Sequence, residues 1–331
     1  MMKLQLPAPS AKRLAGFLQS EAGNTPRSGH WQHFSSLNHI SVDAAAGTVT
    51  FRAGAGFDSE YELNFRKRTL AETLSRHWLG IRGLNPDSRF SGAFFKLLPD
   101  NPAIDARTAT NLLHPPMTAH KFLAVHYANL LLPSLPAIGK TTYVEIGPGS
   151  GYLAALVHRH RPGRLILIDL PEILPYSFLL LHRTFPDSPF LLPNELEDGT
   201  VRLPQEGFVY MTADQASRLP DDCMDIGVNT ASFGEMLPHL VDQYFTLLRR
   251  IVKPDGLFFT CNRVEKWMSG GNDPTGAGAK VPVRFDQYPW SPLDRDIFYG
   301  KSVFHDLVQP ENPMLQRLCR LAPSPAAATS A

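Results

Sequence analysis

The segment from Thr141 to Tyr152 constrains the fold of this chain more than any other. It begins with β-branched and aromatic residues, then has glycine at positions 147, 149 and 151 before a helical pattern starts. This pattern predicts a buried strand, a tight turn and a helix. Glycines let a backbone turn sharply and let a ligand lie against the main chain. Because free amides at a helix N-terminus attract anionic groups, the turn is predicted to bind a ligand.

The residues after the turn continue an alternating α/β pattern. The apolar run from Arg164 to Asp169 predicts a second buried strand that ends in an acid. A carboxylate at this place faces the ribose of a bound nucleoside and can accept two hydroxyl hydrogen bonds. The alternative for Asp169 is an N-cap of a helix that starts near Pro171. The order strand, glycine turn, helix, strand and acid favours the ribose role.

Length, charge and cysteine content limit the classes of protein to consider. At 331 residues the chain exceeds the ~100–200 residues of a typical domain, so we expect a core domain with additions. With 32 Lys and Arg against 31 Asp and Glu the net charge is +1, which argues against a nucleic acid partner. Three cysteines without paired spacing favour a reducing compartment. Without a signal peptide or an apolar run near ~20 residues, a cytoplasmic protein with no membrane partner is expected.

Periodicity and turn residues predict the remaining elements of the sheet. Strands are expected at 208–211, 224–229 and 257–261, with a long helix at 237–251 between the last two. A hairpin of two strands at 281–285 and 297–304 is expected to close the sheet.

The N-terminal third is predicted to be an accessory region. It has a hairpin pattern at 39–51 and a helical repeat at 70–78. We divide the chain into an accessory or cap region at 1–117, a ligand-binding domain at 118–308 and a C-terminal segment at 309–331 whose small-residue tail is expected to be disordered. The Gly-rich stretch 270–280 is expected to form a loop over the site.

Residues 140 to 262 resemble the class I S-adenosylmethionine-dependent methyltransferases, whose motif I is matched by Glu145-x-Gly-x-Gly-x-Gly151. The segments 168–172 and 229–236, together with Tyr288-Pro-Trp290, look more narrowly like the sugar O-methyltransferases of bacteria. The resemblance implies a Rossmann-like, doubly wound α/β fold with a seven-stranded, mostly parallel sheet and a mainly helical N-terminal accessory region. It also implies S-adenosylmethionine as the cofactor and a small-molecule acceptor, a hydroxyl of a sugar or glycosylated metabolite.

By this resemblance several residues are expected to bind the methyl donor. Glu145 would reach its methionine portion, or else make a structural bond to the glycine loop, since a carboxylate in a buried strand is costly without a partner. Asp214 and Gln215 would meet the adenine, unless they form an N-cap or an exposed turn. The full set of expected donor-binding residues is Glu145, Gly147, Gly149, Gly151, Asp169, Leu170, Asp214, Gln215, Asn229 and Thr230.

Methyl transfer from a sulfonium is an in-line displacement, so the protein mainly has to align donor and acceptor. A sugar hydroxyl also needs a group that takes its proton. Glu235, after the fourth strand, and His239, one turn later, are candidates for this catalytic role. Glu235 could instead complement a helix dipole, and His239 could be a solvated helix residue. His120, on the helix before the first strand, could enter from the lid side.

Other sites and functions are disfavoured or left open by the sequence. Asp221, Asp222 and Asp225 are expected to point apart, so no metal site is predicted. Tyr152 replaces the third glycine of the dinucleotide fingerprint, which argues against a nicotinamide-dependent oxidoreductase. N- or C-methylation, a nucleoside-binding module without catalysis, and assembly into a homo-oligomer remain open.

Overall fold

The fold is described from a computed structural model, which describes residues 2–20, 39–52, 102–113, 119–135, 141–269, 280–308 and 313–323. Its centre is an eight-stranded sheet in the order β12-β13-β9-β8-β4-β5-β7-β6. Every neighbouring pair from β6 to β9 is parallel, and β13 is antiparallel to both β9 and β12. The strands are β4 (Thr141–Ile146), β5 (Gly163–Asp169), β6 (Phe190–Leu191), β7 (Gly207–Thr212), β8 (Met224–Thr230), β9 (Val252–Arg263), β12 (Arg295–Lys301) and β13 (Met314–Arg320).

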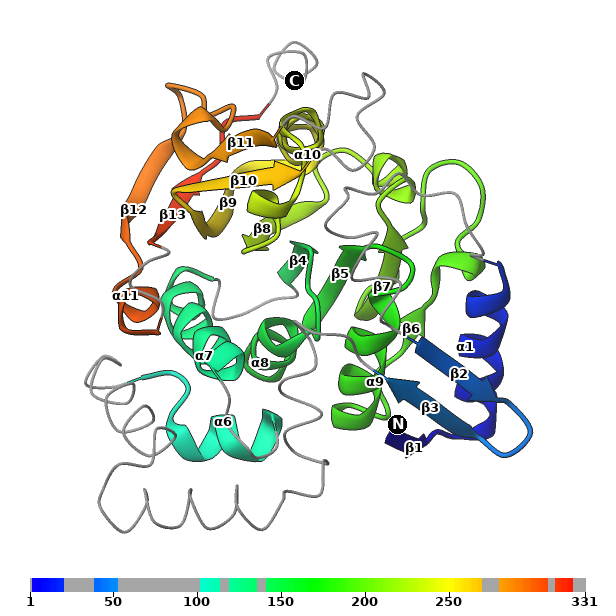
Figure 1. Cartoon of the computed structure of the whole chain (residues 1–331). Helices are drawn as coiled ribbons and strands as arrows, with labels where there is room; N and C mark the ends of the chain where they lie inside the picture. Colours follow the sequence, from blue (N-terminus) through cyan, green and yellow to red (C-terminus); the bar gives the residue numbers. More distant parts are fainter. Residues whose placement is uncertain are drawn as a thin grey trace, which may run out of the picture.

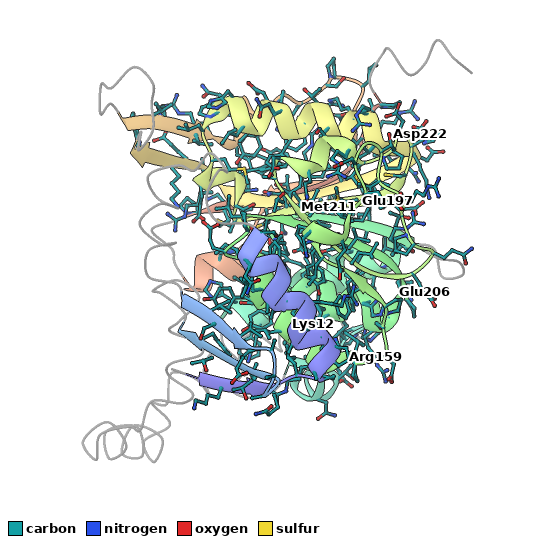
Figure 2. The ribbon with its side chains drawn as sticks, turned by 90° about the vertical axis from the view of Figure 1, so that its right-hand side faces the viewer. Lys12, Arg159, Glu197, Glu206, Met211 and Asp222 are labelled. Atoms are coloured by element: carbon teal, nitrogen blue, oxygen red, sulfur yellow. The ribbon has the colours of Figure 1, made fainter. Side chains whose placement is uncertain are left out.

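Helices cover both faces of this sheet (Figures 1 and 2). On one side lie α7 (Ala119–Leu131), α8 (Tyr152–His160) and α9 (Leu174–Thr184), and on the other lies α10 (Pro238–Ile251). This is the Rossmann-like, doubly wound arrangement that the sequence predicts, with eight strands instead of seven. The two-residue edge strand β6 is among the strands that the sequence left unassigned.

The side chains of the central strands divide between two apolar cores, one on each face of the sheet. In β4, for example, Tyr143 belongs to the core under α7, α8 and α9, whereas Val144 and Ile146 belong to the core under α10. All six residues of β4 are buried, as expected for a central parallel strand covered on both faces. The carboxyl ends of β4, β5 and β8 therefore meet at one edge, where a ligand can bind.

A small unit formed by the N-terminal residues packs beside the edge strand β6. It consists of β1 (Met2–Gln5), α1 (Ala8–Ser20), β2 (His39–Asp43) and β3 (Thr48–Arg52), with the strands in the antiparallel order β1-β3-β2. The predicted hairpin is confirmed as β2 and β3. In Figure 2 α1 runs across the front of the molecule, with Lys12 on it. A further helix, α6 (Ala106–Leu113), lies close to α8.

The unit is held by a polar contact from α1. Arg13 of α1 forms an ion pair with Glu195 and donates a 2.7 Å hydrogen bond to the carbonyl oxygen of Phe190 in β6. Its guanidinium also lies 3.8 Å from the centre of the Phe190 ring.

The C-terminal part differs from the predicted closing hairpin. Residues 280–284 form β11, which pairs with β10 (Glu265–Ser269) in a separate two-stranded sheet, so the prediction that 281–285 joins the main sheet is wrong. The strand predicted at 297–304 is β12, followed by a helix, α11 (Val303–Val308). The strand inserted between β12 and β9 is β13, which lies in the segment expected to follow the domain.

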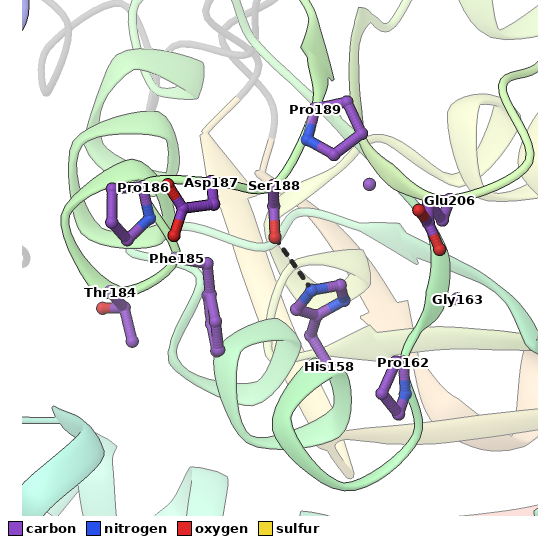
Figure 3. A pocket seen from close by; sticks show the side chains of 11 residues that line it. His158, Pro162, Gly163, Thr184, Phe185, Pro186, Asp187, Ser188, Pro189 and Glu206 are labelled. Atoms are coloured by element: carbon purple, nitrogen blue, oxygen red, sulfur yellow. Dashed lines mark hydrogen bonds between the residues drawn. The ribbon is translucent and has the colours of Figure 1, made fainter.

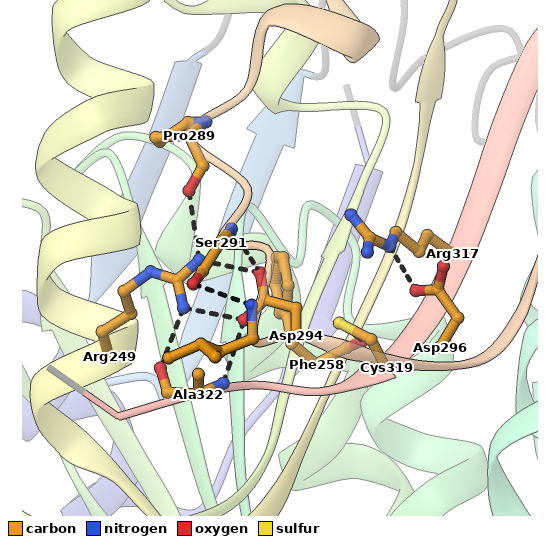
Figure 4. A network of polar contacts seen from close by, with 10 residues as sticks. Arg249, Phe258, Pro289, Ser291, Asp294, Asp296, Arg317, Cys319 and Ala322 are labelled. Carbon is orange, nitrogen blue, oxygen red and sulfur yellow. Dashed lines mark hydrogen bonds and ion pairs between the residues drawn. The ribbon is translucent and has the colours of Figure 1, made fainter.

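A buried ion pair joins this C-terminal part to α10 (Figure 4). The Arg249 guanidinium donates two hydrogen bonds of 2.8 Å to the carboxylate of Asp294, whose side chain has no exposed surface. Arg249 also donates to the carbonyl oxygens of Pro289 and Ala322. The contacts attach the loop before β12 and the end of β13 to one helix.

Several predictions lie outside the described residues. They are the helical repeat at 70–78, the glycine-rich loop at 270–279 and the tail after 323. The division into three regions stays a prediction.

Candidate active site

The turn between β4 and α8 has the left-handed backbone that its glycines predict. Gly147, Gly149 and Gly151 have φ angles of 72°, 55° and 76°. A Cβ at position 147 would overlap the hydroxyl of Ser232, so the turn after β4 packs directly against the turn after β8. Gly151 is the N-cap residue of α8 and provides no side chain to bond the first helical amides. Those amides therefore keep donors for a ligand.

Asp169 lies at the end of β5 and reaches across to this turn. Its Oδ2 accepts a 3.1 Å hydrogen bond from the amide of Gly149, and its Oδ1 accepts a 2.8 Å bond from the amide of Leu170. A carboxylate has about four acceptor positions, so room remains for the two hydroxyls of a ribose. The alternative role is wrong, because α9 begins at Leu174 with Ile173 as its N-cap residue, and no side chain accepts a capping hydrogen bond from its first amides.

Glu145 lies inside β4, with only 2% of its surface exposed. Its Oε2 accepts a 2.8 Å hydrogen bond from the hydroxyl of Tyr143, a partner that the sequence analysis did not name. Burial raises the pKa of Glu145 to about 8, the Tyr143 hydrogen bond opposes this rise, and the charge of Asp169 adds to it. A cation bound nearby would favour the ionised form of both acids.

The crevice around Asp169 is acidic. Burial raises the pKa of Asp169 to about 7, against the lowering effect of its two amide hydrogen bonds, and the charges of Glu172 and Glu235 raise it further. Tyr244 of α10 lies near Asp169 and Asp214, because the charges of these two acids add to the effect of burial, which raises the pKa of Tyr244. The helical period predicts only that Tyr244 lies on the packed face of α10, so the sequence analysis missed it as a site residue.

Asn229, at the end of β8, is part of a buried hydrogen-bond network. Its Nδ2 donates to the carbonyl oxygen of Ile146 at 2.9 Å and to the Ser232 hydroxyl, while its Oδ1 accepts from the amide of Phe233 and from Asn262. All four hydrogen-bonding positions of this amide are therefore occupied. The expectation that Asn229 binds the donor directly is corrected: it holds the turn after β8 against β4 and β9.

The candidate base Glu235 lies in this same turn, in a single turn of 3₁₀ helix at 233–235. It forms a 2.8 Å ion pair with Lys266 of β10, and both side chains are largely buried. Because Glu235 also acts on the pKa of Asp169, it lies beside the donor crevice. His239 is exposed in the first turn of α10.

The remaining predicted residues divide between the crevice and the scaffold. Leu170 and Thr230 are half-buried at the ends of β5 and β8, and Asp214 is exposed near Tyr244. Gln215 accepts a 3.1 Å bond from the amide of Thr212 and donates a 3.0 Å bond to the carbonyl of Pro193. These contacts fix its amide in the loop, and its expected contact with the adenine stays a prediction.

His120 is exposed at the start of α7 and lies near His305 of α11, because its charge lowers the pKa of that imidazole. The structure therefore places His120 near α11. Next to it on α7, the ammonium of Lys121 lies 5.4 Å from the centre of the Tyr152 ring, at the start of α8. The first turn of α7 thus borders the glycine turn.

The Tyr288-Pro-Trp290 stretch, one basis of the sugar methyltransferase resemblance, belongs to the apolar core. The Trp290 ring lies 4.9 Å from that of Phe245, and the Tyr288 ring lies 5.8 Å from that of Phe233. Packing against α10 accounts for these aromatic residues.

A cavity of about 400 Å³ lies at the opposite edge of the sheet, where β5 and β7 begin (Figure 3). It is lined by His158, Ser188 and Glu206 among others, and His158 Nε2 lies 3.3 Å from the Ser188 hydroxyl. Among the described residues no group of three or more His, Cys, Asp or Glu side chains is arranged to hold a metal ion. No helix in the described ranges is both long enough and apolar enough to cross a membrane.

The residues at the carboxyl edge fit S-adenosylmethionine in charge and hydrogen-bonding capacity. The first amides of α8 have no side-chain cap, the acceptor positions of Asp169 suit a ribose, and the acids around it suit a sulfonium cation. Gly147, Gly149, Gly151 and Asp169 would hold the nucleoside and amino acid portions, and Glu145 lies beneath them.

No family model matches the sequence, and no curated protein matches it. Similar solved structures include an arsenic(III) S-adenosylmethionine methyltransferase from Chlamydomonas reinhardtii, with 13% identity, a TM-score of 0.36 and coverage of 58% of this chain and 66% of that one. Geranyl diphosphate C-methyltransferase from Streptomyces coelicolor has 11% identity, a TM-score of 0.40 and coverage of 71% and 97%.

Phosphoethanolamine N-methyltransferase 1 from Haemonchus contortus has 14% identity and a TM-score of 0.42, and the match covers 73% of this chain and half of that one (50%). These proteins are S-adenosylmethionine-dependent methyltransferases, and their named acceptors differ from one another. Similarity at this level carries no information about the acceptor of the present chain.

Proposed function

We propose that this protein is an S-adenosylmethionine-dependent methyltransferase that acts on a small molecule. The observation that carries the proposal is the contact between the Asp169 carboxylate and the amide of Gly149. It joins the acid at the end of β5 to a turn of three left-handed glycines, inside an acidic crevice at the carboxyl edge of the sheet. This arrangement offers a ribose acceptor, backbone donors and negative charge within one site.

S-adenosylmethionine supplies a methyl group on a positively charged sulfur. The chain's own residues then have to orient that group, bind the acceptor and receive a proton. Glu235 is the candidate for proton transfer, since it is the carboxylate beside the crevice on the turn after β8. Lys266 holds the carboxylate of Glu235 in place through a 2.8 Å ion pair.

The first test is donor binding. Asp169→Ala removes two ribose hydrogen bonds to a charged acceptor, each worth ~1.5–3 kcal/mol, so we expect affinity for S-adenosylmethionine to fall about a hundredfold or more in calorimetric titration. The matched control is Asp255→Ala, which removes a strongly exposed acid that pairs with Arg320 at the other edge of the sheet. Equal affinity of the Asp169→Ala and unmodified proteins would contradict the proposal.

The second test separates chemistry from binding. Glu235→Gln keeps the shape of the side chain but cannot take a proton, so turnover should fall about a hundredfold while donor affinity changes little. His239→Gln serves as the comparison, because His239 is exposed in the first turn of α10, four residues after Glu235. Unchanged turnover in Glu235→Gln would remove this residue as the base.

For the acceptor, we infer O-methylation of a sugar or glycosylated small molecule from the segments 168–172 and 229–236. Incubation with a methyl-labelled donor and cell extract, followed by mass identification of the labelled product, tests this class. A product methylated on nitrogen or carbon would exclude the O-methyltransferase, and donor binding with no product from any extract would indicate a binding module. Thermal stabilisation by a nicotinamide cofactor in place of the donor would support an oxidoreductase.

A further inference from the structure

Arg263, the last residue of β9, combines partial burial with the absence of a partner. Its guanidinium has no ion pair or hydrogen bond with any residue in the described part of the chain, although it is half-buried. By strand alternation it faces the same side of the sheet as Phe259 and Cys261, which pack under α7. An arginine presents a planar fork of donors that fits a carboxylate or a phosphate.

The groups around Arg263 are basic as well. The amide of Ser302, just before α11, donates a hydrogen bond to the carbonyl oxygen of Met314. Met314 in turn is the strand partner of Arg263. Ser302 also holds the ring of His305 through a 3.1 Å contact with Nδ1. Burial is the largest cause of the lowered pKa of His305. The charges that lower it further all belong to bases, His126, His120 and Arg263. His305 is 7% exposed, and its pKa of about 4 keeps it neutral at pH 7.

This basic group lies next to the acidic crevice. Asn262, adjacent to Arg263 in sequence, bonds Asn229 and the amide of Gly234, so the end of β9 is tied to the turn that carries Glu235. The start of α7 borders the glycine turn through Lys121 and Tyr152. One half of the carboxyl edge is therefore negative and suits a cationic donor, and the neighbouring half is positive.

We propose that the region between α7, α11 and the end of β9 binds the methyl acceptor through an anionic group, a carboxylate or a phosphate, with Arg263 as its anchor. This rests on the proposed function, and it narrows the acceptor to an acidic small molecule, such as a sugar acid or a sugar phosphate. The neighbouring imidazoles would donate or accept hydrogen bonds at the same group, because His305 is held neutral in a fixed orientation.

The test uses the full chain with S-adenosylhomocysteine present and follows the histidine ring signals by NMR. Inorganic phosphate and glucuronate are titrated separately, and methyl glucoside is the neutral comparison. The NMR signal of His305 is assigned as the one that is missing from the spectrum of His305→Asn. We expect phosphate or glucuronate to shift this signal in a saturable way. Arg263→Gln should weaken this binding about tenfold or more, and Arg295→Gln, which removes an equal charge from an exposed position at the other end of β12, should leave it unchanged.

The outcomes also separate the two proposals. Two outcomes would overturn the anion site and leave the methyltransferase proposal standing, provided that S-adenosylhomocysteine binds normally. One is that the anions cause no saturable shift, and the other is that the unmodified protein, Arg263→Gln and Arg295→Gln bind the anions equally. Saturable binding of methyl glucoside equal to that of glucuronate would also overturn it. A failure to bind S-adenosylhomocysteine would count against the methyltransferase, while the anion titration of the three proteins would still decide the role of Arg263.

Discussion

At the scale of single residues, Gly147 is where the turns after β4 and β8 meet. Gly147→Ala would force a left-handed backbone on a residue with a Cβ, and that Cβ would overlap Ser232. We expect a loss of about 2–4 kcal/mol in the free energy of unfolding, measured by urea denaturation. Gly199→Ala separates the backbone strain from the overlap with Ser232, since Gly199 has a φ of 86° but no atom lies within 4 Å of the added Cβ. A loss at position 147 no greater than at position 199 would contradict the contact.

Much of the site at residue scale follows from the sequence, because motif I and the acid after the second strand lie within a continuous stretch. Gly147, Gly151 and Asp169 lie where the pattern places them. The residues that pair with the acids of the site do not follow from the sequence. Lys266 pairs with Glu235 from a hairpin 31 residues away. No local pattern identifies such a partner, since only the folded chain brings the two side chains together.

At the scale of elements, the ion pair of Arg249 and Asp294 links α10 to the ends of the last two strands (Figure 4). Arg249→Ala leaves a buried carboxylate without its partner, so we expect a loss of about 3–5 kcal/mol in the free energy of unfolding. The neighbouring Arg250 pairs with the mostly exposed Asp221. Arg250→Ala should therefore cost under about 1 kcal/mol in the same denaturant experiment. Similar losses in the two variants would show that the buried pair does not link these elements.

The strands of the parallel part of the main sheet that the sequence predicts, β4, β5, β7, β8 and β9, have apolar runs. The strands nearer the C-terminus are predicted less completely, for physical reasons. In β13 the residues Met314 to Arg320 mix apolar and basic side chains, because the strand lies near the edge and is only partly buried. Residues 281–285 have the composition of a strand, but their partner is β10 and not the main sheet. Strand composition can be read locally, whereas strand pairing depends on the whole chain.

At the scale of the whole molecule, the acids of the crevice make stability depend on pH. Glu145 and Asp169 have folded-state pKa values of about 8 and about 7, above the ordinary values of 4.5 and 3.8. The folded protein therefore holds protons that the unfolded chain has lost, and this stabilisation disappears as the pH rises through these values. We expect the melting temperature of the ligand-free protein to fall between pH 5 and pH 8.

Glu145→Gln tests the origin of this dependence, since glutamine accepts the Tyr143 hydrogen bond but never ionises. The variant should lose less stability than the unmodified protein over the same pH range, in differential scanning calorimetry. Glu197→Gln, on the surface, is the control. Binding of a cationic donor should in turn release protons, which titrations in buffers of different ionisation enthalpy would detect. Parallel stability curves for the Glu145→Gln and unmodified proteins would exclude Glu145 as the source.

The contact between Arg13 and β6 has a consequence for solubility. A strand at the border of a sheet exposes backbone groups that can recruit a strand from another molecule. Here α1 supplies a guanidinium to the Phe190 carbonyl, and β6 has only two residues to offer. We therefore expect that a chain lacking residues 1–20 would expose β6 and aggregate more readily, without a direct change at the carboxyl edge of the sheet.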